Sequence, residues 1–232
     1  MVLTELLNNH DEFVNDIVDA IPWWELDDEH RPLMTRYLDH GNRDEELVSF
    51  ILQKNESLVA AGINHGHIKR GAKLHDVAKP FVTEGDATLW DRSELSEEDR
   101  RKIRNHPLAG HDAIVYAGAK KGLEVPQVVL DIVCMHHERL DGSGYPNHLT
   151  SDMIPAYVQL FSVVDFVVSM GEDHDIRPYR EAGYTLVQTH TIMKRLADEG
   201  KLNREYVEEV FRLLSANDHM SNPQLEFLGT WE

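Results

Sequence analysis

The sequence has a single cysteine, Cys134, among its 232 residues. No intrachain disulfide can form, and this fits a reducing compartment. Basic residues are also scarce, because 23 Lys and Arg stand against 41 Asp and Glu and leave a formal net charge of −18. Such an excess of negative charge disfavours binding to long DNA or RNA. It does not exclude a small anionic ligand, because a pair of bound divalent cations would reverse the local charge of a site.

Long hydrophobic runs are absent as well. The longest apolar stretch, residues 156–170, is interrupted by Gln159 and Asp165 and is too short to span a bilayer. Residues 1–5 lack the basic start and apolar core of a secretory signal peptide. We therefore expect a cytoplasmic protein that does not bind a membrane.

What the sequence does contain is apolar residues at helical spacing along most of its length. We predict an all-α fold with helices at residues 31–40, 44–63, 66–77, 108–119, 156–170, 184–199 and 204–214, and a short one after Ser96. Residues 81–92 are expected to form a loop or one small hairpin. The length suits one domain with short extensions. We divide the chain into a helical N-terminal extension (1–35), a main domain (36–215) and a C-terminal tail packed on it (216–232).

One stretch carries a distinctive pattern, His136-His137-Glu138-Arg139-Leu140-Asp141-Gly142-Ser143-Gly144-Tyr145-Pro146. It follows an apolar run and begins with two adjacent imidazoles. Neighbouring residues of a helix point about 100° apart, so both rings can face one ion only if the helix ends there. Gly142 and Gly144 supply a permissive backbone for that exit. We interpret the stretch as part of a metal site rather than as an exposed loop with a chance histidine pair.

Further candidate ligands are expected near helix ends. His75 and Asp76 are adjacent, and the two oxygens of one carboxylate can bridge two ions, which an imidazole cannot do. Lys79 shares a helix face with Asp76 if the helix continues that far. His106 precedes a proline, and the residue before a proline is driven out of helical geometry. His106 is therefore expected at a junction, with its side chain directed inward.

Asp165 is an isolated acid in a run of valine and phenylalanine. A buried carboxylate without a cationic partner is costly. Because the neighbouring residues leave almost no polar stripe for this acid to occupy, we favour a metal ligand over a solvent-facing acid.

Together the candidate ligands are His40, His75, Asp76, His106, His136, His137 and Asp165. They fall on different helix ends or loops, as a site at the centre of a helical bundle requires. Five imidazoles and two carboxylates suit Fe, Mn or Zn better than Mg or Ca. The number of ligands fits two ions bridged by Asp76.

Over residues 36–215 the sequence resembles the HD-GYP family of the HD phosphohydrolase superfamily. The matching residues are His75-Asp76 with Lys79, His106-Pro107 with Gly110, His136-His137-Glu138 with Asp141-Gly142 and Gly144-Tyr145-Pro146, Asp165, and Arg177-Pro178-Tyr179-Arg180. The resemblance implies an HD-domain helical bundle with a dinuclear metal site. It also implies hydrolysis of a cyclic dinucleotide, cyclic di-GMP or a relative, by a hydroxide that bridges two divalent ions. Fe or Mn is the expected metal, with Zn or Ni as alternatives.

The same resemblance implies a role for each site residue. One ion would bind His40, His75, Asp76 and Asp165, and the other would bind Asp76, His106, His136 and His137. Asp76 and Lys79 would be the catalytic residues, with Lys79 neutralising charge on a phosphate oxygen. Substrate contacts would come from Gly144, Tyr145, Arg177 and Arg180. Glu138 and Asp141 would fix the tautomers of the ligand imidazoles.

The chain departs from the family pattern at several positions. Ala78 replaces the usual Gly of the His-Asp-x-Gly-Lys motif, Gln159 stands where many members have Arg, and the step from Asp165 to Arg177 is longer than usual. Arg36 stands where members with a third ion carry Glu, so we expect two ions.

Two other functions remain open at this point. Other HD-superfamily enzymes, which are nucleotide phosphohydrolases or diiron oxygenases, share the His/Asp ligands but lack the Gly-Tyr-Pro loop. A weakly active adaptor that binds a cyclic dinucleotide is suggested by the departures from the family pattern. The oligomeric state is not predicted.

Overall fold

The computed structural model describes residues 11–83, 86–172 and 182–218. Over these ranges the α-helices are α2 (Glu12–Ala20), α3 (Arg31–Lys54), α4 (His65–Leu74), α5 (Glu97–Arg104), α6 (His106–Lys121), α7 (Gln127–Met135), α8 (Ala156–Gly171), α9 (Leu186–Asp198) and α10 (Arg204–Leu213). The only β-type pairing of the described residues is one isolated bridge between Asp141 and Thr150. The all-α prediction is confirmed.

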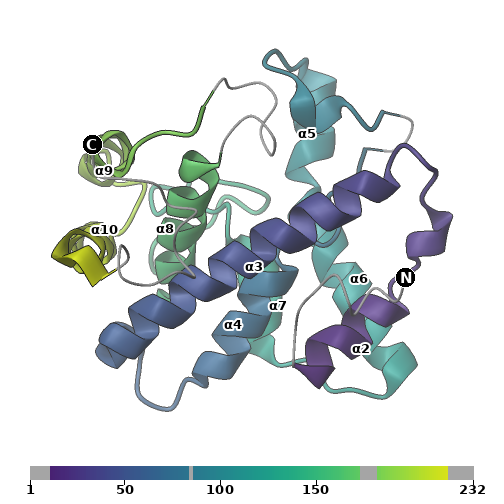
Figure 1. The fold of residues 1–232 in the computed structure, drawn as a ribbon, viewed down its shortest axis with the longest axis horizontal. Helices are drawn as coiled ribbons and strands as arrows, with labels where there is room; N and C mark the ends of the chain where they lie inside the picture. Colours follow the sequence, from purple (N-terminus) through teal and green to yellow (C-terminus); the bar gives the residue numbers. More distant parts are fainter. Residues whose placement is uncertain (1–10, 84–85, 173–181, 219–232) are drawn as a thin grey trace.

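The long helix α3 crosses the molecule, with α4 and α7 beside it at the centre (Figure 1). Helix α3 packs on α4 and α8, and α4 packs on α7. Helices α2 and α6 lie to one side of this centre, and α8, α9 and α10 lie to the other. The ends of α4, α6 and α7 and the middle of α3 carry most of the candidate ligands.

Two groups of buried apolar side chains hold these helices together. The larger one joins α3, α4, α8, α9 and α10 and includes Ile51, Phe161 and Phe211. The second joins α2, α6 and α7 and includes Ile17 and Ile114. Helix α2, from the predicted N-terminal extension, is therefore part of a core. The predicted domain start at residue 36 falls inside α3, and most of the predicted tail, residues 219–232, lies outside the described ranges.

The predicted break between residues 40 and 44 is wrong, because α3 runs without interruption from Arg31 to Lys54. Gly41, which falls between the two predicted helices, lies where α3 meets α4. A Cβ atom on Gly41 would lie 2.4 Å from the backbone oxygen of Lys73. The missing side chain therefore permits a close helix–helix approach, and this brings His40 next to the end of α4.

Of the two alternatives for residues 81–92, the loop is confirmed and the hairpin is not, because the described residues of that stretch form turns and the short 3₁₀-helix η3 (Leu89–Asp91). Asp86 organises these turns. Its backbone N–H donates to the Thr83 oxygen at 2.7 Å, and its carboxylate accepts from the Thr88 hydroxyl at 2.7 Å. Local side-chain bonds of this kind favour turns over strands.

The apolar helix predicted at residues 156–170 is confirmed as α8, Ala156–Gly171. It is buried on most sides, and Phe161 and Val164 are fully inaccessible. In the described ranges of the chain, no helix is both long enough and apolar enough to cross a membrane.

Candidate metal centre

His75 and Asp76 lie just past the end of α4, which finishes at Leu74. The chain continues in tight turns, with Val77 N–H donating to Leu74 O and Lys79 N–H to Asp76 O. These turns direct both side chains inward, where each is only 1% exposed.

His106 and His136 also occupy helix ends. His106 is the first residue of α6, and its Nδ1–H donates to the carbonyl oxygen of Ile103 at 2.7 Å. Helix α7 ends at Met135, and the Nδ1–H of His136 donates back to Val133 at 2.9 Å. A carbonyl oxygen can only accept, so each Nδ1 carries the hydrogen and each Nε2 presents a lone pair. The predicted helix end at the histidine pair is confirmed.

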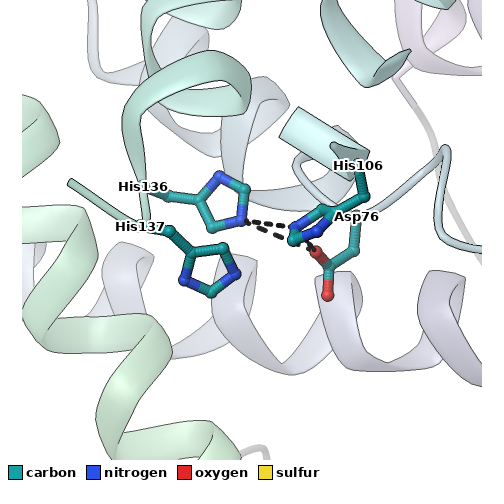
Figure 2. Close-up of side chains that lie close together, drawn as sticks. All are labelled: Asp76, His106, His136 and His137. Atoms are coloured by element: carbon teal, nitrogen blue, oxygen red, sulfur yellow. Dashed lines mark hydrogen bonds and ion pairs between the residues drawn. The ribbon is translucent and has the colours of Figure 1, made fainter. Parts of the chain in front are cut away.

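Asp76, His106, His136 and His137 form one group of possible ligands (Figure 2), with one ligand atom from each within 4.8 Å of the others. The Nε2 atoms of His106 and His136 lie 3.2 Å apart, and they lie 3.2 and 3.6 Å from Oδ1 of Asp76. Burial lowers the pKa of His106 to about 4 and that of His137 well below its usual value. Neutral imidazoles are the form that binds a metal.

His40, Asp44, His75 and Asp165 form a second group with the same spacing. The Nε2 atom of His40 lies 3.3 Å from both Asp165 Oδ1 and Asp44 Oδ2. Burial alone would lower the pKa of His40, but the charges of Asp44, Glu172 and Asp165 outweigh it and raise that pKa to about 10. Burial raises the pKa of Asp44 to about 7. Three carboxyl groups, those of Asp44, Asp165 and Glu172, thus face the His40 ring.

Asp76 links the two groups. Its Oδ1 faces His106 and His136, whereas its Oδ2 lies 3.3 Å from His75 Nε2 and 3.7 Å from His40 Nε2. Burial opposes ionisation, but the neighbouring imidazoles and the Lys79 ammonium hold the pKa of Asp76 well below its usual range. One ionised carboxylate with each oxygen directed at a different group is the arrangement that a shared ligand of two ions requires.

The residues present fit two divalent transition-metal ions. The Nε2 atoms of His40 and His75 are buried and have no hydrogen-bond partner among the described residues. The Nδ1–H of His75 donates to Ala72 O at 2.7 Å, and that of His40 donates to Glu172 Oε1 at 2.6 Å. Lone pairs therefore converge from both groups, which is unfavourable unless a cation lies between them. Imidazole nitrogens with a few carboxylates suit Fe, Mn or Zn.

Lys79 lies against this cluster and is 5% exposed. Its Nζ forms an ion pair with Asp76 Oδ2 and lies 4.9 Å from the ring centres of both Tyr37 and Trp90. The Trp90 indole N–H also donates to the backbone oxygen of Lys79 at 3.2 Å. Two aromatic rings and a carboxylate thus fix the position of the ammonium.

Glu138 and Asp141 do not take the role that the sequence suggested. Glu138 is buried and accepts backbone N–H groups of Asn147 at 2.6 Å and Leu149 at 3.0 Å. Asp141 is exposed and accepts from Ser143. The Nδ1 atoms of His40, His75, His106 and His136 have other partners. The prediction that these two acids fix the tautomers is therefore wrong for these four rings, and Glu138 instead holds the loop together.

The Gly-Tyr-Pro segment folds back over the histidine pair. Tyr145 N–H donates to His137 O at 3.2 Å, and the Tyr145 ring packs on the His137 ring with centroids 4.7 Å apart. A Cβ atom on Gly144 would lie 2.3 to 2.5 Å from the backbone of Glu138 and Arg139. Glycine is thus required here for close packing, whereas Gly142 is required for its positive φ of 78°.

The structure brings together all seven ligands that the sequence predicted, but Arg177 and Arg180 lie outside the described residues. Sequence reasoning missed the acids Asp44 and Glu172 and the aromatic residues Tyr37 and Trp90. Asp44 had a usable signal, because it follows His40 by four residues and shares its face on a continuous helix. The other three contacts depend on tertiary packing and leave no local pattern.

A family model described as the HD domain matches residues 86–205, which is more than half of the chain. The chain belongs to the HD domain family. The resemblance seen in the sequence is confirmed at this level.

Two curated relatives illustrate the similarity. One is the cyclic di-GMP phosphodiesterase response regulator RpfG of Xanthomonas campestris, 32% identical over 115 residues, which are 50% of this chain and 28% of the relative. Another is the 3'3'-cGAMP-specific phosphodiesterase 2 of Vibrio cholerae, 31% identical over 104 residues, which are 45% of this chain and 19% of the relative. The matched segments thus span less than a third of these relatives.

A solved structure supports the fold. It is described as a HDG"Y"P protein from Bdellovibrio bacteriovorus, and it matches with a TM-score of 0.54 at 20% identity. The match covers 77% of this chain and 52% of that one. At this identity the similarity concerns the fold, which agrees with the helical arrangement described above.

Proposed function

We propose that this chain is a metal-dependent phosphodiesterase that hydrolyses a cyclic dinucleotide, cyclic di-GMP or a close relative. The observation that carries the proposal is the position of Asp76, whose two oxygens face two separate groups of buried ligands. Relatives named as phosphodiesterases for cyclic di-GMP and for 3'3'-cGAMP support the same substrate class.

The proposed centre holds two divalent ions, Fe or Mn in the first place and Zn or Ni as alternatives. The ligands taken from the sequence are His40, His75, Asp76 and Asp165 for one ion, and Asp76, His106, His136 and His137 for the other. Two such ions would lower the pKa of a water molecule and polarise the scissile phosphate. The backbone carbonyls that accept from the Nδ1–H groups keep the imidazoles in the orientation that this requires.

The remaining residues bind and position the substrate in this proposal. Lys79, held beside Asp76, neutralises the charge that develops on a phosphate oxygen. Tyr145 places an aromatic ring next to His137, where a nucleobase could stack. Gly144 lets the loop that carries Tyr145 lie close to the histidine pair. Arg177 and Arg180 remain proposed phosphate contacts.

A substrate panel tests the function. The full chain is purified anaerobically, stripped of metal and reloaded with Mn²⁺ or Fe²⁺, and is then incubated with cyclic di-GMP and with 3'3'-cGAMP. We expect a linear dinucleotide or mononucleotides from at least one of them, detected by liquid chromatography. Tight binding without product in protein that holds two ions would reject the enzyme and favour an adaptor. Oxygen consumption with an organophosphonate or a polyol would favour an oxygenase.

Lys79→Met should lower kcat by about 10²-fold, because it removes a cation placed to stabilise charge in the transition state. Methionine keeps much of the volume between Tyr37 and Trp90. Metal content, measured on the same samples, should remain at two ions per chain. A simultaneous loss of metal would contradict the proposed role and indicate that Lys79 maintains the ligand geometry instead.

A further inference from the structure

Asp44 is a buried acid that the ligand set taken from the sequence does not include. It lies on α3 four residues after His40, so the two side chains project from the same face of the helix. Its side chain is 0% exposed, and its Oδ2 lies 3.3 Å from His40 Nε2. Neither of its carboxylate oxygens has a hydrogen-bond partner among the described residues.

In the part of the chain that the structure describes, the groups that can compensate the Asp44 carboxylate are the imidazoles of its own ligand group. Among the described residues, His40 is the only side chain within ion-pair distance of Asp44. Arg43, the residue before Asp44, pairs with Glu172, and Lys79 pairs with Asp76. Burying a carboxylate without a partner is strongly unfavourable, and adding Asp165 to the same cluster increases the repulsion.

The Nε2 atom of His40 faces both carboxylates, and either a proton or a metal ion on this atom compensates their charge. The Nδ1–H of the same ring donates to Glu172 Oε1 at 2.6 Å, which leaves the Nε2 lone pair directed at Asp44 and Asp165. A carboxylate that holds the far nitrogen of an imidazole is the usual support of a metal-binding histidine. The geometry therefore indicates a cation between Asp44, His40 and Asp165.

We propose that Asp44 is an additional ligand of the ion bound by His40, His75 and Asp165. This inference rests on the dinuclear centre of the proposed function. With Asp44 the first site offers two imidazoles together with the carboxylates of Asp44 and Asp165 and Oδ2 of Asp76. The second site offers three imidazoles and Asp76 Oδ1. Because carboxylates favour Mn²⁺ relative to Zn²⁺ and imidazoles favour Zn²⁺, the first site is the one that prefers Mn²⁺.

Asp44→Asn tests this proposal, because asparagine keeps the shape and removes the charge. The metal-free full chain is titrated with Mn²⁺ by calorimetry, and bound ions are counted after desalting. We expect two sites in the wild-type protein, and in the variant one site weakened by at least about tenfold with the other unchanged. Glu46→Gln is the matched control, since Glu46 is a partly buried acid on the same helix that belongs to neither ligand group.

The melting temperature of the metal-free protein provides a second measurement. If Asp44 only stabilised the fold, its substitution would lower this Tm, whereas the loss of a metal ligand should raise it. Metal-free Asp44→Asn should melt at a higher temperature than metal-free wild type, because the uncompensated carboxylate is gone. Its rise in Tm on adding Mn²⁺ should be smaller than that of the wild type. Asp44→Val, which replaces the carboxylate by an apolar side chain, should show the same two changes.

The outcomes separate this inference from the proposed function. Unchanged affinity at both sites, or a lower Tm in the metal-free variant with the full Mn²⁺ response retained, would overturn the assignment of Asp44. Wild-type protein that binds two Mn²⁺ ions and hydrolyses no cyclic dinucleotide would instead overturn the proposed function, and the comparison of Mn²⁺ affinities would still decide the role of Asp44.

Discussion

Asp76→Ala is expected to remove both bound ions and to reduce hydrolysis of a cyclic dinucleotide by about 10³-fold or more, because one carboxylate serves both sites. Its Oδ1 faces His106 and His136, and its Oδ2 faces His40 and His75. No other described residue lies in this position between the two groups. The measurement is metal content by elemental analysis after desalting, together with the rate of product formation.

Two further variants control this experiment. Removing the Asp76 carboxylate also leaves Lys79 without its ion-pair partner, so Asp76→Asn, which keeps the side-chain volume, distinguishes lost ligation from general damage. Asp39→Asn removes a partly buried acid next to His40 that belongs to neither ligand group, and it should retain both ions. Two bound ions and normal turnover in Asp76→Asn would show that the carboxylate is not shared.

Gly144→Ala should lower the free energy of unfolding of the metal-free protein by about 2–3 kcal/mol. The new Cβ would lie 2.3 to 2.5 Å from the backbone of Glu138 and Arg139, and backbone cannot move aside as a flexible side chain can. Glu138 is itself held by its bonds to Asn147 and Leu149, so the loop resists the shift. Denaturant unfolding followed by circular dichroism measures the change.

Ser143→Ala is the matched control in the same loop. Ser143 is exposed, and its hydroxyl donates to Asp141 at 2.6 Å. Loss of one exposed hydrogen bond should cost less than about 1 kcal/mol. If Gly144→Ala were as mild as Ser143→Ala, the close packing of the loop on the histidine pair would not be a determinant of stability.

The parts of the site that the sequence predicted correctly depend on local signals. The proline after His106 places a helix junction there, and Ser96 with Asp99 forms the capping box that begins α5. The adjacent histidines require a helix end, and α7 ends at Met135. Because His75, His106 and His136 are each positioned by their own short segment, the order of residues along the chain predicted their places.

The errors arise where distant segments decide the structure. Gly41 falls in the break predicted between residues 40 and 44. In the structure it lies within α3 and lets this helix approach the backbone of Lys73, which is 32 positions away in the sequence. Splitting the helix there hid the spacing between His40 and Asp44. Similarly, Glu138 is a carboxylate next to the histidine pair, and for that reason it was expected to support an imidazole. The path of the loop instead directs its oxygens to the backbone N–H groups of Asn147 and Leu149.

Backbone carbonyls at helix ends hold several of the ligand imidazoles in place, and this bears on folding without metal and on the exchange of bound ions. The rings of His75, His106 and His136 are fixed by bonds to Ala72, Ile103 and Val133, and the two apolar cores lie outside the ligand groups. We therefore expect the metal-free chain to fold, in contrast to a zinc finger. Ions bound at the proposed centre could then be exchanged without unfolding the chain, so the metal it holds would depend on the supply of each ion as well as on the preference of each site.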